Sequence, residues 1–249
     1  MRLGELGLKA MFSLAIGAAL FGASSASAAV LVTEFLPDPS GTDIDREWFE
    51  IYNSGATPVD LSGYAAGDGT NPASTSTGEA MGVFPAGSII AAGGVWVIAA
   101  DAEGFAAFYG FNPNFEFQNS TSTNFPGDDP TVPNLTQKPG WGVANASLAI
   151  ANGGDDVGIL TPESDSTTFT FIDGGNHGTV TTFYTGAVAL TANQSYERVP
   201  ANQDTNTVSD WVVRTTGTAT PGVVTVPEPA SIGLALMGGL LAVRRPRRR

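Results

Sequence analysis

The stretches 29–36, AVLVTEFL, and 47–52, EWFEIY, decide the fold class of this chain. The first is rich in β-branched and aromatic residues, which favour extended backbone. In the second, Trp48, Glu50 and Tyr52 would share one face of a strand, and the two apolar residues between them would share the other. We therefore predict that both stretches are β-strands.

Similar runs continue along the chain and alternate with turns rich in Gly, Pro, Asn, Asp and Thr. One short helix is expected at residues 102–109, where Phe105, Phe108 and Tyr109 follow helical spacing. Many short strands with few helices predict an all-β fold, an antiparallel β-sandwich. The further strands are expected at residues 59–64, 88–91, 95–99, 147–151, 156–161, 167–173, 181–184, 194–199 and 210–214.

The composition excludes several classes of protein. The 249 residues include 11 Lys and Arg against 24 Asp and Glu, a net charge of −13, and no Cys. Without Cys, the chain has no disulfide, thiolate metal site or cysteine nucleophile. An acidic surface repels phosphates, so nucleic acid is not an expected partner. Because 42% of the residues are hydrophobic, we expect a folded chain rather than a disordered one.

Residues 1–28 have the features of a signal peptide. After a basic start, residues 11–22 form an apolar stretch, and small residues then lead to Ala28. We predict that signal peptidase cleaves between Ala28 and Ala29. A buried N-terminal helix is the alternative, and it is disfavoured because a strand follows without a linker.

The segment 226–249 has three parts. They are Pro227-Glu228-Pro229, an apolar run at 230–243, and an arginine cluster at 244–249 that begins with Arg244 and Arg245. A helix of the length of the apolar run spans about 21 Å, less than the hydrocarbon core of a bilayer, so a transmembrane helix here would be a weak permanent anchor. The arginines should remain on the cytoplasmic side of the membrane.

This tail closely resembles the PEP-CTERM sorting signal of Gram-negative bacteria. The resemblance implies recognition by a membrane-embedded exosortase, cleavage near the Pro-Glu-Pro motif, and delivery to the cell surface or the exopolysaccharide matrix. An uncleaved C-terminal anchor is the alternative. Both interpretations place residues 29–225 outside the inner membrane. Removal of the two terminal segments leaves four basic and 22 acidic residues, a net charge of −18.

The interior of the chain is similar to the lamin tail domain family in three places. These are residues 30–37, 47–53 and 57–64 at the start, residues 147–148 and 152–157 in the middle, and residues 194–199, 210–211 and 220–222 at the end. The resemblance implies an immunoglobulin-like β-sandwich over residues 30–222. Two insertions, about 65–86 and 112–140, depart from the family pattern. The second is polar and rich in Pro, and we expect it to lie on the surface, where it could carry binding or be inert.

The sequence offers little chemistry for catalysis. The single histidine, His177, lies in Gly-Gly-Asn-His-Gly and is expected in an exposed turn. Neither a Gly-x-Ser-x-Gly elbow nor a phosphate-binding loop is present. One His without Cys disfavours a zinc site. The adjacent carboxylates of Asp155 and Asp156 leave a glycosidase as the alternative, and we predict that the protein is not an enzyme.

Calcium is the cofactor that the acidic residues could bind, because Ca²⁺ takes six to eight oxygen ligands. The candidate ligands are Asp43, Asp45, Glu47, Asp128 and Asp129. No segment has the full EF-hand pattern, and solvated acidic loops are the simpler interpretation.

Arg198 is one of four basic residues between positions 29 and 225. We expect it to pair with a carboxylate in the fold, with Glu34, Glu47 and Glu50 as the candidates.

Together these observations predict an exported protein of the cell surface or extracellular matrix with a non-enzymatic role in binding, adhesion or structure. Its expected partners are signal peptidase and exosortase during export, and then exopolysaccharide or surface proteins. Two alternatives remain open. One is a secreted hydrolase acting on polysaccharide or nucleic acid, and the other is a coat component that self-associates with calcium.

Overall fold

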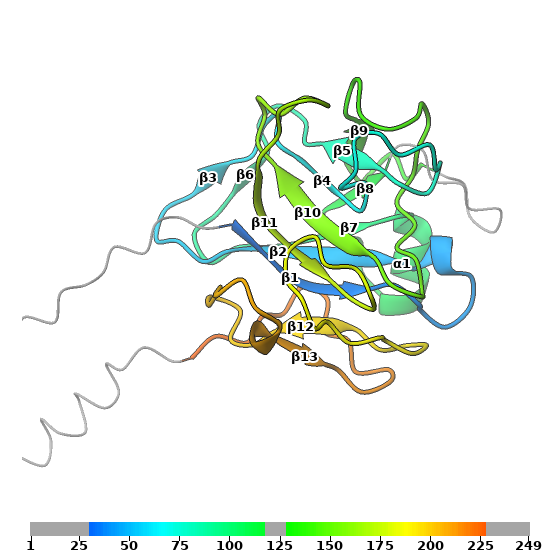
Figure 1. Cartoon of the computed structure of the whole chain (residues 1–249), viewed down its shortest axis with the longest axis vertical. Coiled ribbons are helices and arrows are strands. Elements are labelled where there is room, and N and C mark those ends of the chain that lie inside the picture. The colour runs from blue at the N-terminus through cyan, green and yellow to red at the C-terminus, as the bar shows by residue number, and fades with distance from the viewer. Residues whose placement is uncertain (1–29, 118–127, 228–249) are drawn as a thin grey trace, which may run out of the picture.

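The computed structural model describes residues 30–117 and 128–227 (Figure 1). The strands are β1 (Val30–Leu36), β2 (Trp48–Asn53), β3 (Val59–Asp60), β4 (Ala65–Gly67), β5 (Met81–Val83), β6 (Ile89–Ile90), β7 (Val95–Ala99), β8 (Phe115–Phe117), β9 (Asn134–Gln137), β10 (Asp156–Leu160), β11 (Phe171–Asn176), β12 (Tyr196–Arg198) and β13 (Trp211–Val213). The helical elements are α1 (Ala102–Tyr109) and the 3-10 helices η1 (Asp43–Asp45) and η2 (Val208–Asp210).

Eleven strands form one sheet in the order β11-β10-β4-β5-β9-β8-β7-β2-β1-β12-β13, and β3 pairs with β6 separately. The sheet folds over itself, so that β11 at one edge lies against β1. The backbone amide of Val32 in β1 donates to the Asp173 carboxylate of β11, 2.6 Å away. A continuous core fills the space between the layers, with Val32, Phe35 and Ile51 on one side and Ile159 on the other. The predicted all-β sandwich is therefore confirmed.

The two segments interpreted as insertions belong to the sheet. The first contains β4 and β5, and the second contains β8 and β9. β9 pairs with β8 on one side and with β5 on the other, so it joins the two layers. Phe117 and Leu135 from the second segment lie in the core. The prediction that residues 112–140 form a surface insertion is wrong for these two strands.

Most expected elements lie where the sequence placed them. β7 and α1 occupy their expected ranges, and β1, β2 and β10 differ by a residue at one or both ends. The expected strands at 147–151 and 181–184 do not form. The first is instead a loop in which the amides of residues 149, 150 and 151 each donate to a side-chain carboxylate. The amides of Phe183 and Tyr184 in the second donate to the side chain of Asn176.

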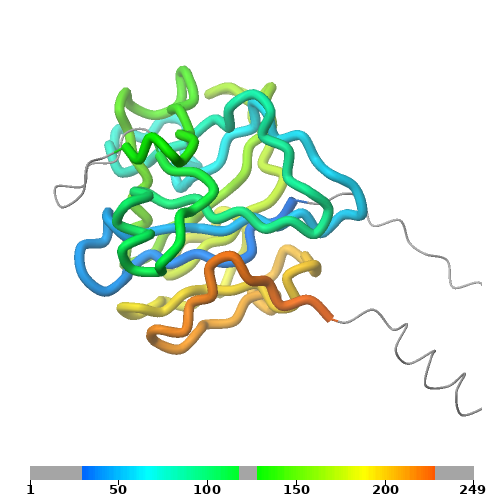
Figure 2. The backbone as a smooth tube through the Cα atoms, turned by 180° about the vertical axis from the view of Figure 1, so that it is seen from behind, coloured from blue at the N-terminus to red at the C-terminus, as the bar shows by residue number. Residues whose placement is uncertain are grey.

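The outer face of the β1–β2–β7 layer is covered by α1 and by the segment that follows β13 (Figure 2). Asp101 caps α1 by accepting a hydrogen bond from the Gly104 amide, and Gly110 ends the helix at φ +82°. Gly104 is required because a Cβ there would lie 2.1 Å from the carbonyl oxygen of Asp45. The helix thereby packs closely on η1.

The two ends of the described chain, Val30 and Pro227, lie on the same side of the molecule (Figures 1 and 2). The predicted signal peptide, its cleavage site at Ala28 and Ala29, the residues Glu228 and Pro229, and the tail at 230–249 fall outside the described residues. Among the described residues, no helix is long and apolar enough to cross a membrane.

Candidate functional site

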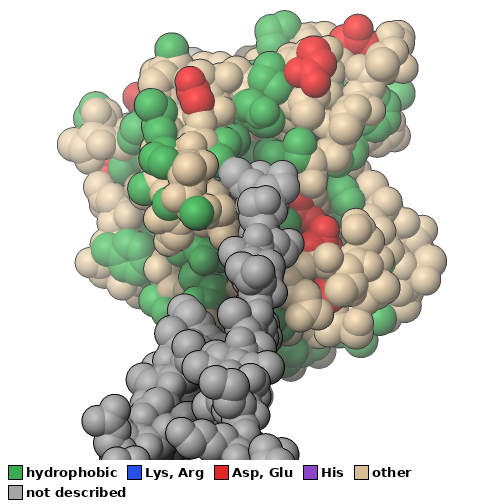
Figure 3. All heavy atoms as spheres, turned by 90° about the vertical axis from the view of Figure 1, so that its left-hand side faces the viewer, with side chains coloured by type: hydrophobic (Ala, Val, Ile, Leu, Met, Phe, Trp, Pro, Cys, Tyr) green, Lys and Arg blue, Asp and Glu red, His purple; other side chains and the backbone are tan. Residues whose placement is uncertain are grey.

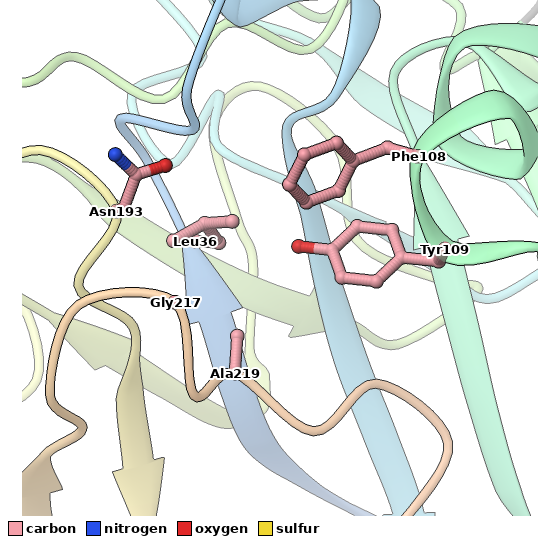
Figure 4. Close-up of a pocket in the computed structure, with 6 residues that line it drawn as sticks. All are labelled: Leu36, Phe108, Tyr109, Asn193, Gly217 and Ala219. Atoms are coloured by element: carbon pink, nitrogen blue, oxygen red, sulfur yellow. The ribbon is translucent and has the colours of Figure 1, made fainter.

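A small pocket opens on the outer face where α1 meets the segment after β13 (Figure 4). We call it the aromatic pocket, and its lining residues are Leu36, Phe108, Tyr109, Asn193, Gly217 and Ala219. A bulge in β1 helps to form it. Thr33 is the extra residue in the pairing with β2, so Glu34 and Leu36 face outward while Phe35 enters the core.

Two aromatic side chains from α1 form one wall of the aromatic pocket. The Phe108 side chain is 45% exposed, and the Arg46 guanidinium lies 4.8 Å from its ring centre. The Tyr109 hydroxyl points toward Leu36 and accepts a hydrogen bond of 2.9 Å from the Trp48 indole. Burial raises the pKa of Tyr109 to about 12, so its hydroxyl keeps the proton and remains a donor at ordinary pH.

The size of the aromatic pocket limits what it can hold. Its volume is about 60 Å³. Pockets that enclose a whole small molecule measure several hundred Å³, whereas a water molecule needs roughly 10–15 Å³. The pocket therefore fits one small group of a larger ligand. Exposed rings beside a hydroxyl and the Asn193 amide suit a neutral group that has both apolar and hydrogen-bonding surface.

Three buried glutamates lie beside the pocket on the same outer face. Glu34 of β1 is opposite Glu50 of β2 on one side and Glu197 of β12 on the other, so the three form a row across adjacent strands. We call them the glutamate row. Each of the three residues is at most 2% exposed, although the alternation of β2 would place such residues in solvent. The segment after β13 covers them.

Two of the calcium candidates, Asp43 and Glu47, instead bind the loop before β10. The Glu47 carboxylate accepts from the Ile150 amide at 3.1 Å, and Asp43 accepts from the Asn152 side chain at 3.0 Å. Burial, together with nearby acidic groups, raises the pKa of Glu47 to about 10. Asp45 lies in η1 and is also buried, not in a solvated loop.

The other calcium candidates, Asp128 and Asp129, are engaged within their own turn. Asp128 accepts from the Asn134 side chain at 2.6 Å, and Asp129 accepts from the amide and hydroxyl of Thr131. Within residues 30–117 and 128–227, no group of three or more His, Asp or Glu side chains is arranged to hold a metal ion. The structure thus does not bring the candidate ligands together.

The adjacent carboxylates of Asp155 and Asp156 accept hydrogen bonds from neighbouring parts of the chain. Asp155 accepts from the amides of Ala151 and Asp156, at 2.6 and 2.8 Å, and Asp156 accepts from the Thr182 hydroxyl. Desolvation raises the pKa of Asp155 to about 7. Both side chains are buried, so their arrangement serves the loop and does not open toward a substrate.

His177 is buried, and the prediction of an exposed turn is wrong. Its ring lies 5.9 Å from the Phe35 ring, and its amide donates to the Asp155 carbonyl. Burial lowers the pKa of its imidazole to about 4. The flanking glycine is there because two backbone segments touch: a Cβ on Gly178 would lie 2.5 Å from the Cα of Gly154.

Arg198 pairs with carboxylates as expected, but not with the expected ones. Its guanidinium lies 2.9 Å from Asp173 and 2.9 Å from Asp204, and 4.7 Å from the Trp211 ring centre. Glu34 and Glu50 lie on the opposite face of the layer, where Glu197 also points. Arg198 therefore joins β12 to β11 and to the turn before β13.

Sequence reasoning missed the aromatic pocket. Phe108 and Tyr109 were noted only as helix-forming residues, and Asn193, Gly217 and Ala219 carried no signal. An exposed aromatic residue at the end of an amphipathic helix was the one available indication. The walls come from four segments of the chain, which only the fold brings together.

The comparisons with known proteins agree with this architecture. The structure is similar to the crystal structure of a DUF4876 family protein from Bacteroides thetaiotaomicron, with a TM-score of 0.50 and 15% identity over 79% of this chain and 75% of that one. This likeness concerns the fold alone. No curated protein matches the chain. The family model of the Lamin Tail Domain matches residues 23–216. The chain therefore belongs to the lamin tail domain family.

Proposed function

We propose that this protein is exported, sorted by an exosortase through its C-terminal tail, and retained at the cell surface or in the exopolysaccharide matrix as a non-enzymatic binding module. The terminal segments 1–28 and 226–249 support export and sorting. The exit of both ends of the fold on one side supports display from a membrane, because the sandwich can then project away from its point of attachment.

The observation that carries the binding role is the aromatic pocket. It is too small for a whole molecule, but one side leads to the exposed ring of Phe108. A polymer could insert one group into the pocket and place the next group on the Phe108 ring, and would then contact both features. The net charge of −18 over residues 29–225 favours a neutral polymer over an anionic one. We therefore propose a neutral exopolysaccharide as the ligand.

The carboxylates support a non-catalytic role. Glu47, Asp155 and Asp156 are buried and accept hydrogen bonds from the chain itself. Hydrolysis of a glycosidic bond needs two carboxyl groups facing a bound sugar. The hydrolase and the calcium-dependent coat remain the alternatives, and both are tested with the same preparation.

Binding is tested by co-sedimentation of residues 29–227 with the exopolysaccharide of the producing cells. Phe108→Ala should weaken binding several-fold, because the contact of a ligand with one aromatic ring contributes about 1 kcal/mol. Phe169→Ala is the matched control, since Phe169 is a similarly exposed aromatic residue outside the pocket. Equal binding by both variants would contradict the assignment of the pocket. Release of reducing sugar would favour the hydrolase.

Export is tested separately by the intact mass of the protein released from its native cells. We expect an N-terminus at Ala29 and a C-terminus near Pro227. A mass that retains either terminal segment would contradict processing at that end.

A further inference from the structure

The segment 214–225 crosses the outer face and rests on the glutamate row, and we call it the clasp. The Thr220 amide donates to both carboxylate oxygens of Glu34, at 3.3 and 3.2 Å, and its hydroxyl donates at 3.1 Å. The Gly222 amide donates to Glu50 at 2.7 Å. The Thr225 hydroxyl donates to Glu197 at 3.3 Å. Each of the three glutamates thus accepts at least one hydrogen bond from the clasp.

The charges in the glutamate row do not balance. The cationic side chain that faces the row is Arg214, which pairs with Glu197. The other groups that face it are neutral: the hydroxyls of Thr33 and Ser195, which donate to Glu50 and Glu34, and that of Tyr109 from α1. Residues directly opposite on adjacent strands are about 5 Å apart. Three buried carboxylates at this spacing with one cation cannot all ionise without strong repulsion.

Two members of the row, Glu34 and Glu50, therefore hold protons near neutral pH. Desolvation, as the largest cause, raises the pKa of Glu34 to about 7 and that of Glu50 to about 8. Glu34 and Glu50 therefore lose their protons as the pH rises from near neutral to mildly alkaline.

We propose that the clasp is a proton-dependent element that stays closed while Glu34 and Glu50 are protonated and loosens when they ionise. The hydrogen bonds from Thr220 and Gly222 favour ionised carboxylates, but burial raises the pKa of Glu34 and of Glu50 in spite of them. Ionisation therefore favours a state in which water reaches these carboxylates, and water reaches them when the clasp lifts. Gly217 and Ala219 belong to the clasp and line the aromatic pocket, so its opening removes one wall of that pocket. Only this consequence for a ligand rests on the proposed function; the clasp itself does not.

The chain has no Cys, so one introduced thiol carries a nitroxide label at a single place. Val223→Cys labels the clasp, because Val223 is 63% exposed. Val188→Cys is the matched control, an exposed valine outside the clasp. The ionised fraction of a carboxyl with a pKa near 7 rises about ten-fold between pH 6 and pH 8. We expect the mobile fraction of the label at 223 to rise over this interval, and the label at 188 to remain unchanged.

Glu34→Gln with Glu50→Gln provides the decisive comparison, because glutamine resembles a protonated glutamate and cannot ionise. In this background the label at 223 should stay immobile up to pH 9. If circular dichroism shows that the double variant is unfolded, Glu34→Gln alone is used. A label that is equally immobile from pH 5 to pH 9 in the parent protein overturns the proposal. So does a pH profile that the glutamine substitutions leave unchanged. No ligand is present, so these outcomes are independent of polysaccharide binding.

Discussion

Removal of the Arg198 side chain should destabilise the fold more than any other single change to a charged residue that we consider. Arg198 is 1% exposed and donates to Asp173, Asp204 and the Val32 carbonyl. Arg198→Ala leaves Asp173 buried without its cation. Loss of one partner of a buried ion pair costs about 3–5 kcal/mol. For a domain of this size, that corresponds to a fall in melting temperature of roughly 6–20 °C.

The pH dependence of this loss distinguishes an electrostatic cause from lost packing. Burial raises the pKa of Asp173 to about 7 even with Arg198 in place, and removal of the guanidinium raises it further. A raised pKa means that stability is present below the unfolded value and is lost as the pH rises through the folded value. The gap in stability between the parent and Arg198→Ala should therefore be small at pH 5 and larger at pH 8.

Urea unfolding of residues 29–227 at both pH values, followed by circular dichroism, measures this gap. Arg46→Ala is the control for a lost positive charge, because Arg46 contacts only the Phe108 ring and the Ser40 carbonyl among the contacts described, and we expect a loss within about 1 kcal/mol. An Arg198→Ala midpoint equal to that of the parent, or an equal loss at pH 5 and pH 8, would refute the reasoning.

Three further outcomes are expected. Gly174→Ala should lower the free energy of unfolding by about 1–3 kcal/mol in urea titrations, because its Cβ would lie 2.1 Å from the Phe183 ring, whereas Gly153→Ala, with open space around it, should change little. The parent should lose stability between pH 5 and pH 9, by about 3 kcal/mol from Glu34 alone, since its pKa is raised from 4.5 to about 7; a flat profile in chemical unfolding would contradict this. Calorimetry with millimolar Ca²⁺ should show no heat and no shift in melting temperature, because Asp43 and Glu47 already bind the loop before β10, and Asp128 and Asp129 bind residues that follow them closely.

The sequence predicted those elements whose residues meet locally. β2 and β7 follow their alternation, and α1 is set by its Asp101 cap and its Gly110 end. Each of these signals lies within one element and its immediate flanks. This is why the sandwich class and the helix were predictable.

The burial of the glutamate row was not predictable in the same way. Alternation correctly assigned Glu50 to the face opposite Phe49 and Ile51, but that face usually meets solvent. Its cover comes from Gly222, 172 residues further along the chain. The same reason explains the missed parallel pairing of β8 with β7 and β9, because parallel strands carry no turn signal between them.

The aromatic pocket shows a second limit. Its chemistry depends on where Tyr109 points, which the Trp48 indole fixes by its hydrogen bond. Neither residue type reveals such an orientation. The burial of His177 shows the opposite limit, because glycines indicate an exposed turn in a sequence, whereas here they permit two backbone segments to touch.

The position of the clasp determines how the fold would carry a mechanical load. A pull applied at Pro227 reaches Thr225 first, where a hydroxyl bond to Glu197 and a carbonyl that accepts from the Ala201 amide resist it. It then reaches Gly222 and Thr220, each tied to one glutamate. These bonds would break one after another, before the hydrogen bonds between β12 and β13 bear any tension. The clasp would thus extend and dissipate force between an anchored C-terminal end and the sandwich.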